Sequence, residues 1–165
     1  MKKIIPTLLY ILIFTISGRA QTTTRNAKDE LQTMLSTYMN CITEKDSVQF
    51  TKLFYDGPVT WVGIFKPKSQ ESRMQKDSTK VNNYIKGDYK TFIRSLLAKA
   101  NRFEQKFYHV KIQEDGCIAV VTFDYSFQTD MKINNRGQES WSLIKANGKW
   151  KITSVIFSIE LENNS

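Results

Sequence analysis

Few side chains of this sequence could carry out chemistry. His109 is the one histidine, Cys41 and Cys117 are the only cysteines, and they form no Cys-x-x-Cys motif or Cys/His cluster. Zinc sites need three or four such ligands at defined spacing. We therefore expect no metal site and no cofactor. A lone histidine is more often a structural or surface residue than a catalytic one, because a general base also needs a partner within hydrogen-bond reach.

Asp124 is the acid whose position is most informative. It alternates with Val120 and Ser126 on one face of a long predicted strand. An acid midway along a strand is rarely buried unless it is paired. We favour a solvated or cross-strand-paired acid, with Lys132 or Arg136 as the partner. The alternative is a polar group in the wall of a pocket.

The two cysteines allow a disulfide without requiring one. Cys41 falls in an apolar stripe with helical spacing, and Cys117 starts an alternating set that ends at Phe127, so both are predicted to point inward. An oxidising compartment would permit a Cys41–Cys117 bond. A free buried cysteine is also a good small hydrophobe, and we favour that state.

The first 20 residues have the three parts of a secretory signal peptide. Lys2 and Lys3 precede an apolar stretch at 4–16, and small residues before Gln21 suit cleavage. About 13 apolar residues are fewer than the ~20 that a membrane span needs. We expect an exported protein, periplasmic or secreted, that loses residues 1–20 and then makes no membrane contact.

The positive charge of the chain is unevenly distributed. The 165 residues include 24 Lys and Arg against 16 Asp and Glu, a net charge of +8. Three of the cations precede Gln21, and residues 66–87 hold six cations against two acids. This modest excess argues against a nucleic-acid partner. We interpret 66–87 as a solvated loop, and the alternative is a segment that steers an anionic ligand.

Hydrophobic periodicity predicts one domain, residues 26–161, after a polar leader at 21–25. Apolar residues at helical spacing predict helices, and alternating or β-branched stretches predict strands. Helices at the front followed by hairpin-linked strands predict an α+β fold, with helices packed on one face of an antiparallel sheet. The expected helices are 26–44, 46–55 and 88–100, and the expected strands are 59–65, 81–85, 103–113, 117–130, 138–146 and 149–161.

The last predicted strand, 149–161, has large apolar side chains on both faces. A sheet with one face in water should be more polar on that side. An exposed apolar patch of several side chains often marks an interface. We therefore favour a homodimer through the sheet face over a covering made by loops.

Three segments together resemble the nuclear transport factor 2-like superfamily, in particular its SnoaL-like exported bacterial branch. They are a helix pair with Asp46 between its halves, the turn at 54–59 that leads into a strand, and the closing hairpin at 141–152. The resemblance covers about residues 26–161. It implies a cone, in which three helices wrap a strongly bent antiparallel sheet around a pocket, and it implies a dimer through the sheet.

The resemblance also suggests which residues to examine for a site. Steroid-isomerase relatives would place their general base near Trp61, and 59–66 holds no carboxylate, which counts against that activity. Dehydratase-like relatives use a His–Asp pair; His109 is the one histidine here, and Asp124 and Asp130 are the nearest acids on strands. An acid–base enzyme of this type would use Asp124 with the hydroxyl of Tyr125 or Tyr38. The side chains proposed to line the pocket are Tyr38, Trp61, Tyr84, Phe92, Asp124 and Trp141.

Fold does not imply function in such a superfamily. We expect a non-catalytic module that binds a small apolar or anionic molecule in the cone. The first alternative is a SnoaL-like acid–base enzyme of the isomerase, dehydratase or cyclase type. The second is a dimeric protein-interaction domain.

Overall fold

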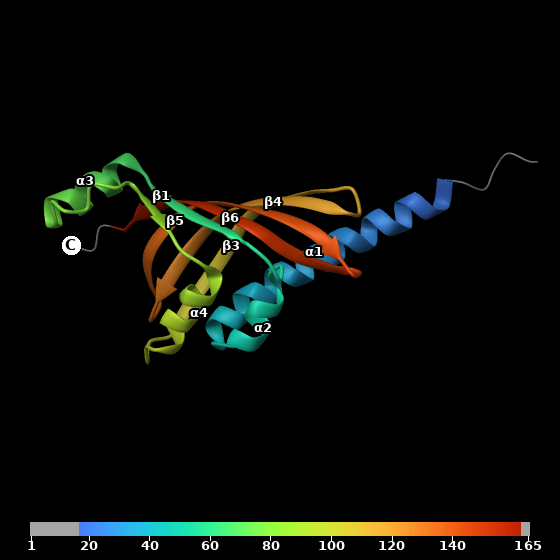
Figure 1. Ribbon diagram of the computed structural model, residues 1–165, viewed down its shortest axis with the longest axis horizontal. Helices are drawn as coiled ribbons and strands as arrows, with labels where there is room; N and C mark the ends of the chain where they lie inside the picture. Colours follow the sequence, from blue (N-terminus) through green and yellow to red (C-terminus); the bar gives the residue numbers. More distant parts are fainter. Residues whose placement is uncertain (1–16, 163–165) are drawn as a thin grey trace, which may run out of the picture.

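Six strands form one curved sheet that carries helices on one side (Figure 1). The computed structural model describes the backbone of residues 17–162 and the side chains of residues 27–162. The strand order is β2-β1-β6-β5-β4-β3, and all neighbours are antiparallel except β1 and β6, which are parallel. The α+β prediction with a bent sheet is confirmed. The strands are β1 Thr60–Phe65, β2 Tyr84–Lys86, β3 Phe103–Glu114, β4 Ile118–Thr129, β5 Lys132–Ala146 and β6 Lys149–Leu161.

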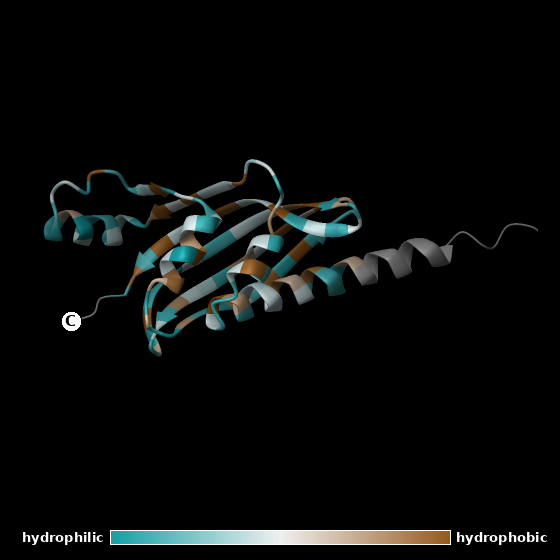
Figure 2. Ribbon diagram, turned by 60° about the horizontal axis from the view of Figure 1, so that its bottom comes forward, coloured by the Kyte–Doolittle hydropathy of each residue, from teal (hydrophilic) through white to brown (hydrophobic). Residues whose placement is uncertain are grey.

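Residues 17–162 contain four helices, of which three cover one face of this sheet and the fourth extends beyond its end (Figure 1). The covering helices are α1 Ser17–Thr43, α2 Ser47–Lys52 and α4 Tyr89–Leu97, which correspond to the three predicted ones. The projecting helix, α3 Pro67–Lys76, was not expected. It is mainly hydrophilic (Figure 2), with Ser69 as its buried residue, so it has no apolar stripe to reveal it.

Helix α1 begins earlier than the sequence indicates. The prediction starts it at residue 26, after a polar leader at 21–25, and in the structure it is already helical from Ser17. No proline lies between residues 17 and 26 to stop the helix. Residues 1–16, which carry most of the predicted signal peptide, lie outside the described part of the chain. Within that part, no helix is long and apolar enough to cross a membrane.

The turn between β4 and β5 lies at Asp130–Met131. The predicted strands 117–130 and 138–146 are instead separated by the Asn-Asn-Arg-Gly sequence at 134–137, which is a turn signal. Asp130 and Met131 both adopt the left-handed conformation, with φ of 51° and 67°. The Asp130 carboxylate fixes the turn by accepting a 2.8 Å hydrogen bond from the backbone N–H of Arg102. Asn134 is the extra residue of a β-bulge, because Phe127 pairs with Asn135 and Gln128 with Ile133. The Asn-rich turn signal therefore marks a bulge inside a longer strand.

The cysteines are free and occupy different environments. Cys41 is buried in α1 as predicted, and burial raises the pKa of its thiol to about 11. Cys117 is exposed, so the prediction that it points inward is wrong. It precedes β4 and belongs to the turn, where its backbone N–H donates to the carboxylate of Asp115. The two residues form no disulfide.

Candidate functional site

Four of the six predicted pocket residues fill the interior of the cone. The rings of Tyr38 and Trp141 lie 4.8 Å apart, and those of Trp61 and Phe92 lie 5.3 Å apart, measured between centroids. Phe54 connects the two pairs, because its ring is 6.5 Å from Tyr38 and 6.0 Å from Trp61. These aromatic side chains pack against one another and line none of the hollows described below.

The other two predicted pocket residues lie at the surface. Tyr84 is exposed on β2, at one edge of the sheet. Asp124 is on β4 and faces away from α1, α2 and α4, on the side that we call the outer face. The six residues are therefore not brought together into one pocket.

Glu139 on β5 is a buried carboxyl group that the sequence analysis missed. Its Oε1 accepts a 2.6 Å hydrogen bond from the indole N–H of Trp141, and its Oε2 accepts a 3.1 Å bond from the amide of Gln105. Burial raises the pKa of Glu139 to about 7, although both hydrogen bonds act in the opposite direction. Burial, together with the charge of Glu139, raises the pKa of Tyr38 and of Tyr125. Both oxygens are engaged, so the buried Glu139 side chain connects β5 to Gln105 of β3 in the interior.

His109 and Asp124 are in contact on the outer face. The His109 Nδ1 and Asp124 Oδ2 atoms lie 2.7 Å apart, so Asp124 rather than Asp130 is the acid beside His109. The hydrogen bond from His109, followed by one from Gln138, lowers the pKa of Asp124. The pair is open to solvent, with 81% of the His109 side chain and 41% of the Asp124 side chain exposed. Asp124 is thus an exposed acid with a local partner, and that partner is His109 rather than Lys132 or Arg136.

A β-bulge in β3 positions the histidine. Tyr108 pairs with Asp124 and Lys111 with Thr122, so two residues, His109 and Val110, lie opposite one residue of β4. His109 adopts φ of 52°, a conformation that costs energy for a residue other than glycine. The extra residue turns His109 toward the outer face and Val110 toward α1. Bulges commonly redirect side chains in this way beside functional sites.

Two open hollows on the outer face, with volumes of about 590 and 500 Å³, meet at this pair and share His109, Asp124 and Gln138. The hydroxyls of Tyr108 and Ser126 lie 3.2 Å apart beside them. Tyr125, the third catalytic candidate, is buried, and its hydroxyl donates to the backbone carbonyl of Ser158. All three candidates therefore border the larger hollow, but the hydroxyl of Tyr125 is already engaged with the backbone.

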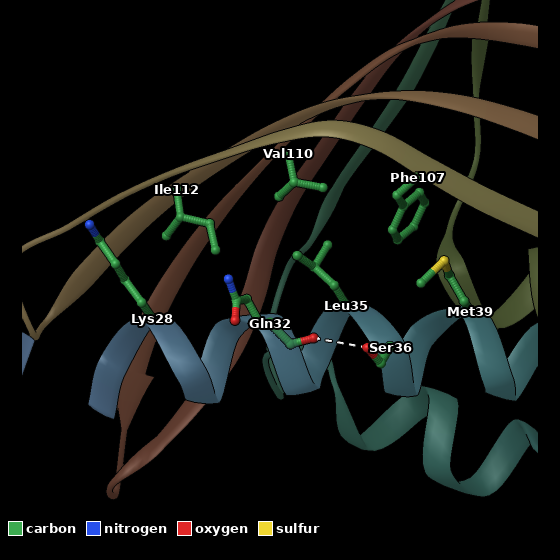
Figure 3. Close-up of a pocket in the computed structure, with 8 residues that line it drawn as sticks. All are labelled: Lys28, Gln32, Leu35, Ser36, Met39, Phe107, Val110 and Ile112. Atoms are coloured by element: carbon green, nitrogen blue, oxygen red, sulfur yellow. Dashed lines mark hydrogen bonds between the residues drawn. The ribbon is translucent and has the colours of Figure 1, made fainter. Parts of the chain in front are cut away.

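A third hollow lies between α1 and β3 and was not predicted (Figure 3). We call it the α1–β3 groove, and its volume is about 390 Å³. Val110 and Ile112 point from β3 toward Leu35 on the helix. Lys28 and Gln32 supply the polar groups at one end. The lining residues are Lys28, Gln32, Leu35, Ser36, Met39, Phe107, Val110 and Ile112.

None of these sites is suited to a metal ion. Within the side chains described, residues 27–162, no three His, Cys, Asp or Glu side chains gather closely enough to hold one.

Solved structures share this architecture. A nuclear transport factor 2-like protein from Salmonella enterica aligns with a TM-score of 0.57 at 22% identity, covering 86% of this chain and 96% of that one. A candidate scytalone dehydratase from Novosphingobium aromaticivorans gives 0.62 at 12% identity over 86% and 89%. The beta subunit of a candidate aromatic-ring-hydroxylating dioxygenase from the same organism gives 0.60 at 13% over 86% and 94%. At these identities the likeness establishes the fold alone.

The curled six-stranded sheet with helices on one face is therefore the nuclear transport factor 2-like cone fold. Residues 74–162, more than half of the chain, match the SnoaL-like domain, and the chain belongs to that family. A search of curated proteins finds no match. The fold includes enzymes as well as proteins of other kinds, so it does not by itself assign an activity.

Proposed function

We propose that this chain is an exported, non-catalytic module that binds a small molecule in the α1–β3 groove. The observation that carries the proposal is the composition of the groove, in which apolar walls end at one cation. Of the eight lining side chains, Lys28 is the one that carries a charge. The volume of the α1–β3 groove falls in the range of about 300–1,000 Å³ that is common for ligand sites.

The lining also indicates the class of ligand. Leu35, Met39, Phe107, Val110 and Ile112 would contact an apolar body, and the ammonium group of Lys28 would contact an anionic end. The groove offers no second titratable group to take or return a proton, which general acid–base catalysis requires. We therefore expect it to bind a molecule such as a medium-chain carboxylate without changing it. The sequence pattern of residues 1–20 supports the proposed export.

Binding of dodecanoate tests the groove. Replacing Lys28 with Gln should weaken dodecanoate binding roughly fivefold, because an exposed ion pair contributes up to about 1 kcal/mol. Binding of dodecanol, which has no charge, should not change. Isothermal titration calorimetry measures both dissociation constants.

Two further variants make the dodecanoate experiment decisive. Lys132→Gln removes the same charge far from the groove and should leave both dissociation constants unchanged. Val110→Asp places a charge in the apolar wall and should abolish binding of both probes. If wild-type protein binds neither probe, or if Lys132→Gln has the effect of Lys28→Gln, the groove is not the ligand site.

Acid–base catalysis is a second candidate, and the 2.7 Å contact between His109 and Asp124 favours it. A carboxylate on Nδ1 orients the ring and leaves Nε2 free to take a proton from a substrate in the adjoining hollows.

Proton exchange into a small cyclic ketone tests this activity. If the pair is catalytic, the chain accelerates deuterium uptake at the α-carbon in D2O, followed by proton NMR, and His109→Gln returns the rate to that of buffer. Asp124→Asn should reduce the acceleration at least tenfold, because the orienting charge is lost. An acceleration that survives His109→Gln would remove the pair from the mechanism.

Dimerisation through the outer face is the third proposal. Large apolar side chains on three strands of this face are exposed to solvent, and more than half of Ile156 is accessible. Exposed apolar patches of this kind mark interfaces. These side chains are Ile64 on β1, Ile118 and Val120 on β4, and Ile156 on β6.

We expect light scattering at micromolar concentration to give the wild-type protein a mass twice that of one chain. Ile156→Lys should return the mass to that of one chain, because it would bury an unpaired charge at the centre of the interface. The exposed Val48→Lys, on the helical side, should leave the dimer intact. A wild-type protein that runs at the single-chain mass would contradict this proposal.

A further inference from the structure

The segment between β1 and α4 forms an ordered projection at one end of the molecule (Figure 1). We call residues 66–86, which include α3 and β2, the basic arm. Ser69 attaches α3 to the sheet, because its hydroxyl accepts a 2.8 Å hydrogen bond from the backbone N–H of Leu161. Gln70 donates to the carbonyl of Lys80 and Arg73 donates to that of Asn82, which holds the following loop against α3. The predicted solvated loop is therefore a defined surface.

The charges of this arm are only partly neutralised. Lys66 pairs with Glu160 at 2.6 Å, and Lys80 lies 3.7 Å from Asp77. Arg73 is stacked over the ring of Phe65, 3.7 Å from its centroid. The remaining three cations are exposed and form no salt bridge with any described residue. They are Lys68, Lys76 and Lys86.

Apolar side chains are exposed between these cations. Met74 on α3 and Val81 in the loop are open to water, Val81 to 65%. Tyr84 and Ile85 on the edge strand β2 are also exposed, as is every other residue from 81 to 88. Exposed cationic and apolar side chains therefore occur together along α3, the loop that follows it and the edge strand β2, which pairs with β1.

We propose that the basic arm docks the protein on a bilayer that contains anionic lipid. Lysine side chains beside such a surface attract its phosphate groups, and their long stems lie along apolar surroundings. Val81 would enter the boundary between headgroups and acyl chains, and Tyr84, at the edge of the sheet, would place its ring there with the hydroxyl in water. This attachment is peripheral, and it differs from the sequence-based expectation of no membrane contact after cleavage.

The shape of the arm favours a lipid surface over a protein partner. Of the three hollows described above, only the one of about 590 Å³ touches the arm, at its base through Lys66. A stable protein interface usually takes about 800 Å² from each partner with close complementarity. A narrow tip with mixed charge and apolar character suits a deformable surface better.

Sedimentation with lipid vesicles tests the proposal on the full chain. We expect binding to phosphatidylglycerol vesicles at 50 mM salt, little binding to phosphatidylcholine vesicles, and release at 500 mM salt. The triple variant Lys68→Gln, Lys76→Gln, Lys86→Gln should bind phosphatidylglycerol vesicles about 100-fold more weakly. Val81→Ser should weaken binding severalfold and leave its salt dependence unchanged.

The matched control removes three lysines elsewhere, with Lys90→Gln, Lys132→Gln and Lys149→Gln. This control variant has the same net charge and the same N-terminal residues as the arm variant, so the two differ only in where the lysines are removed. The affinity of the control for phosphatidylglycerol vesicles should change less than threefold. Equal losses in the two triple variants would assign the effect to total charge and overturn the proposal. Absence of binding to phosphatidylglycerol vesicles would overturn it as well. So would binding to soluble polyglutamate without binding to vesicles, which would identify an acidic protein as the partner.

Discussion

The stability of this protein should fall by about 3 kcal/mol as the pH rises from 4.5 to 7, and Glu139→Gln should remove that loss. The pKa of Glu139 is about 7 in the folded chain against an ordinary value of 4.5. Between these values the unfolded chain has lost the proton that the folded chain still binds. Stability therefore decreases with pH at about 1.4 kcal/mol per unit in this window. The full stability is present below pH 4.5, and the loss is complete above pH 7.

The substitution preserves the local hydrogen bonds. An amide oxygen at position 139 can still accept from the indole of Trp141, and the side chain of Gln105 can rotate so that its own oxygen accepts from the new amide. The variant should therefore be close to wild type at pH 5 and more stable than wild type at pH 8.

Urea unfolding followed by tryptophan fluorescence at pH 5, 6, 7 and 8 measures the difference. Glu71→Gln is the matched control, because Glu71 is exposed on α3 and its replacement should leave the wild-type slope intact. If wild type and Glu139→Gln show parallel stability profiles, the buried carboxyl does not titrate in this range.

The buried position of Glu139 could be predicted from the sequence, but its hydrogen-bond partners could not. Its alternation with Trp141 and Leu143 places it on the inward face, and this signal was present in the sequence. A glutamate on an inward face is expected to have a charged partner, because burial of a lone charge is costly. Its partners, Gln105 and Trp141, are uncharged, and no spacing rule connects a residue of β3 with one of β5.

The fold itself was largely predictable, because apolar periodicity determines which face of each element is buried. Helices α1, α2 and α4 and the closing meander follow from it. Helix α3 has no apolar face, and it is held by polar side chains that include Ser69, Gln70 and Arg73, so periodicity could not reveal it.

The candidate sites depend on a single backbone irregularity. The bulge at His109 and Val110 shifts the alternation of β3 by one residue. On the N-terminal side of the bulge Phe107 faces α1, and on the C-terminal side Val110 and Ile112 face it. Sequence alternation alone could not decide the direction of His109, and it could not assemble the α1–β3 groove, because no turn signal marks the bulge.

Gly137→Ala should destabilise the protein by about 3 kcal/mol. A Cβ added at Gly137 would lie 1.9 Å from the backbone oxygen of Ser158 and 2.9 Å from the ring of Tyr125. The Ser158 oxygen accepts a 2.9 Å hydrogen bond from the Tyr125 hydroxyl, and the Ser158 hydroxyl accepts one from the Gln138 N–H. Strands β5 and β6 would have to separate, which breaks both bonds and adds strain.

Gly87→Ala is the control for the loss of a glycine. Its added Cβ would meet Trp61 at 3.4 Å, an ordinary contact, so stability should stay within about 0.5 kcal/mol of wild type. Tyr125→Phe removes only the hydroxyl and should cost about 1 kcal/mol. Combining it with Gly137→Ala should cost less than the sum, because both changes remove the same bond. Urea midpoints for the four variants and wild type measure these differences. A Gly137→Ala variant as stable as Gly87→Ala would show that β5 and β6 yield at this point. Since Gly137 also lines the hollow that contains His109 and Asp124, such yielding would make the outer face adjustable rather than fixed.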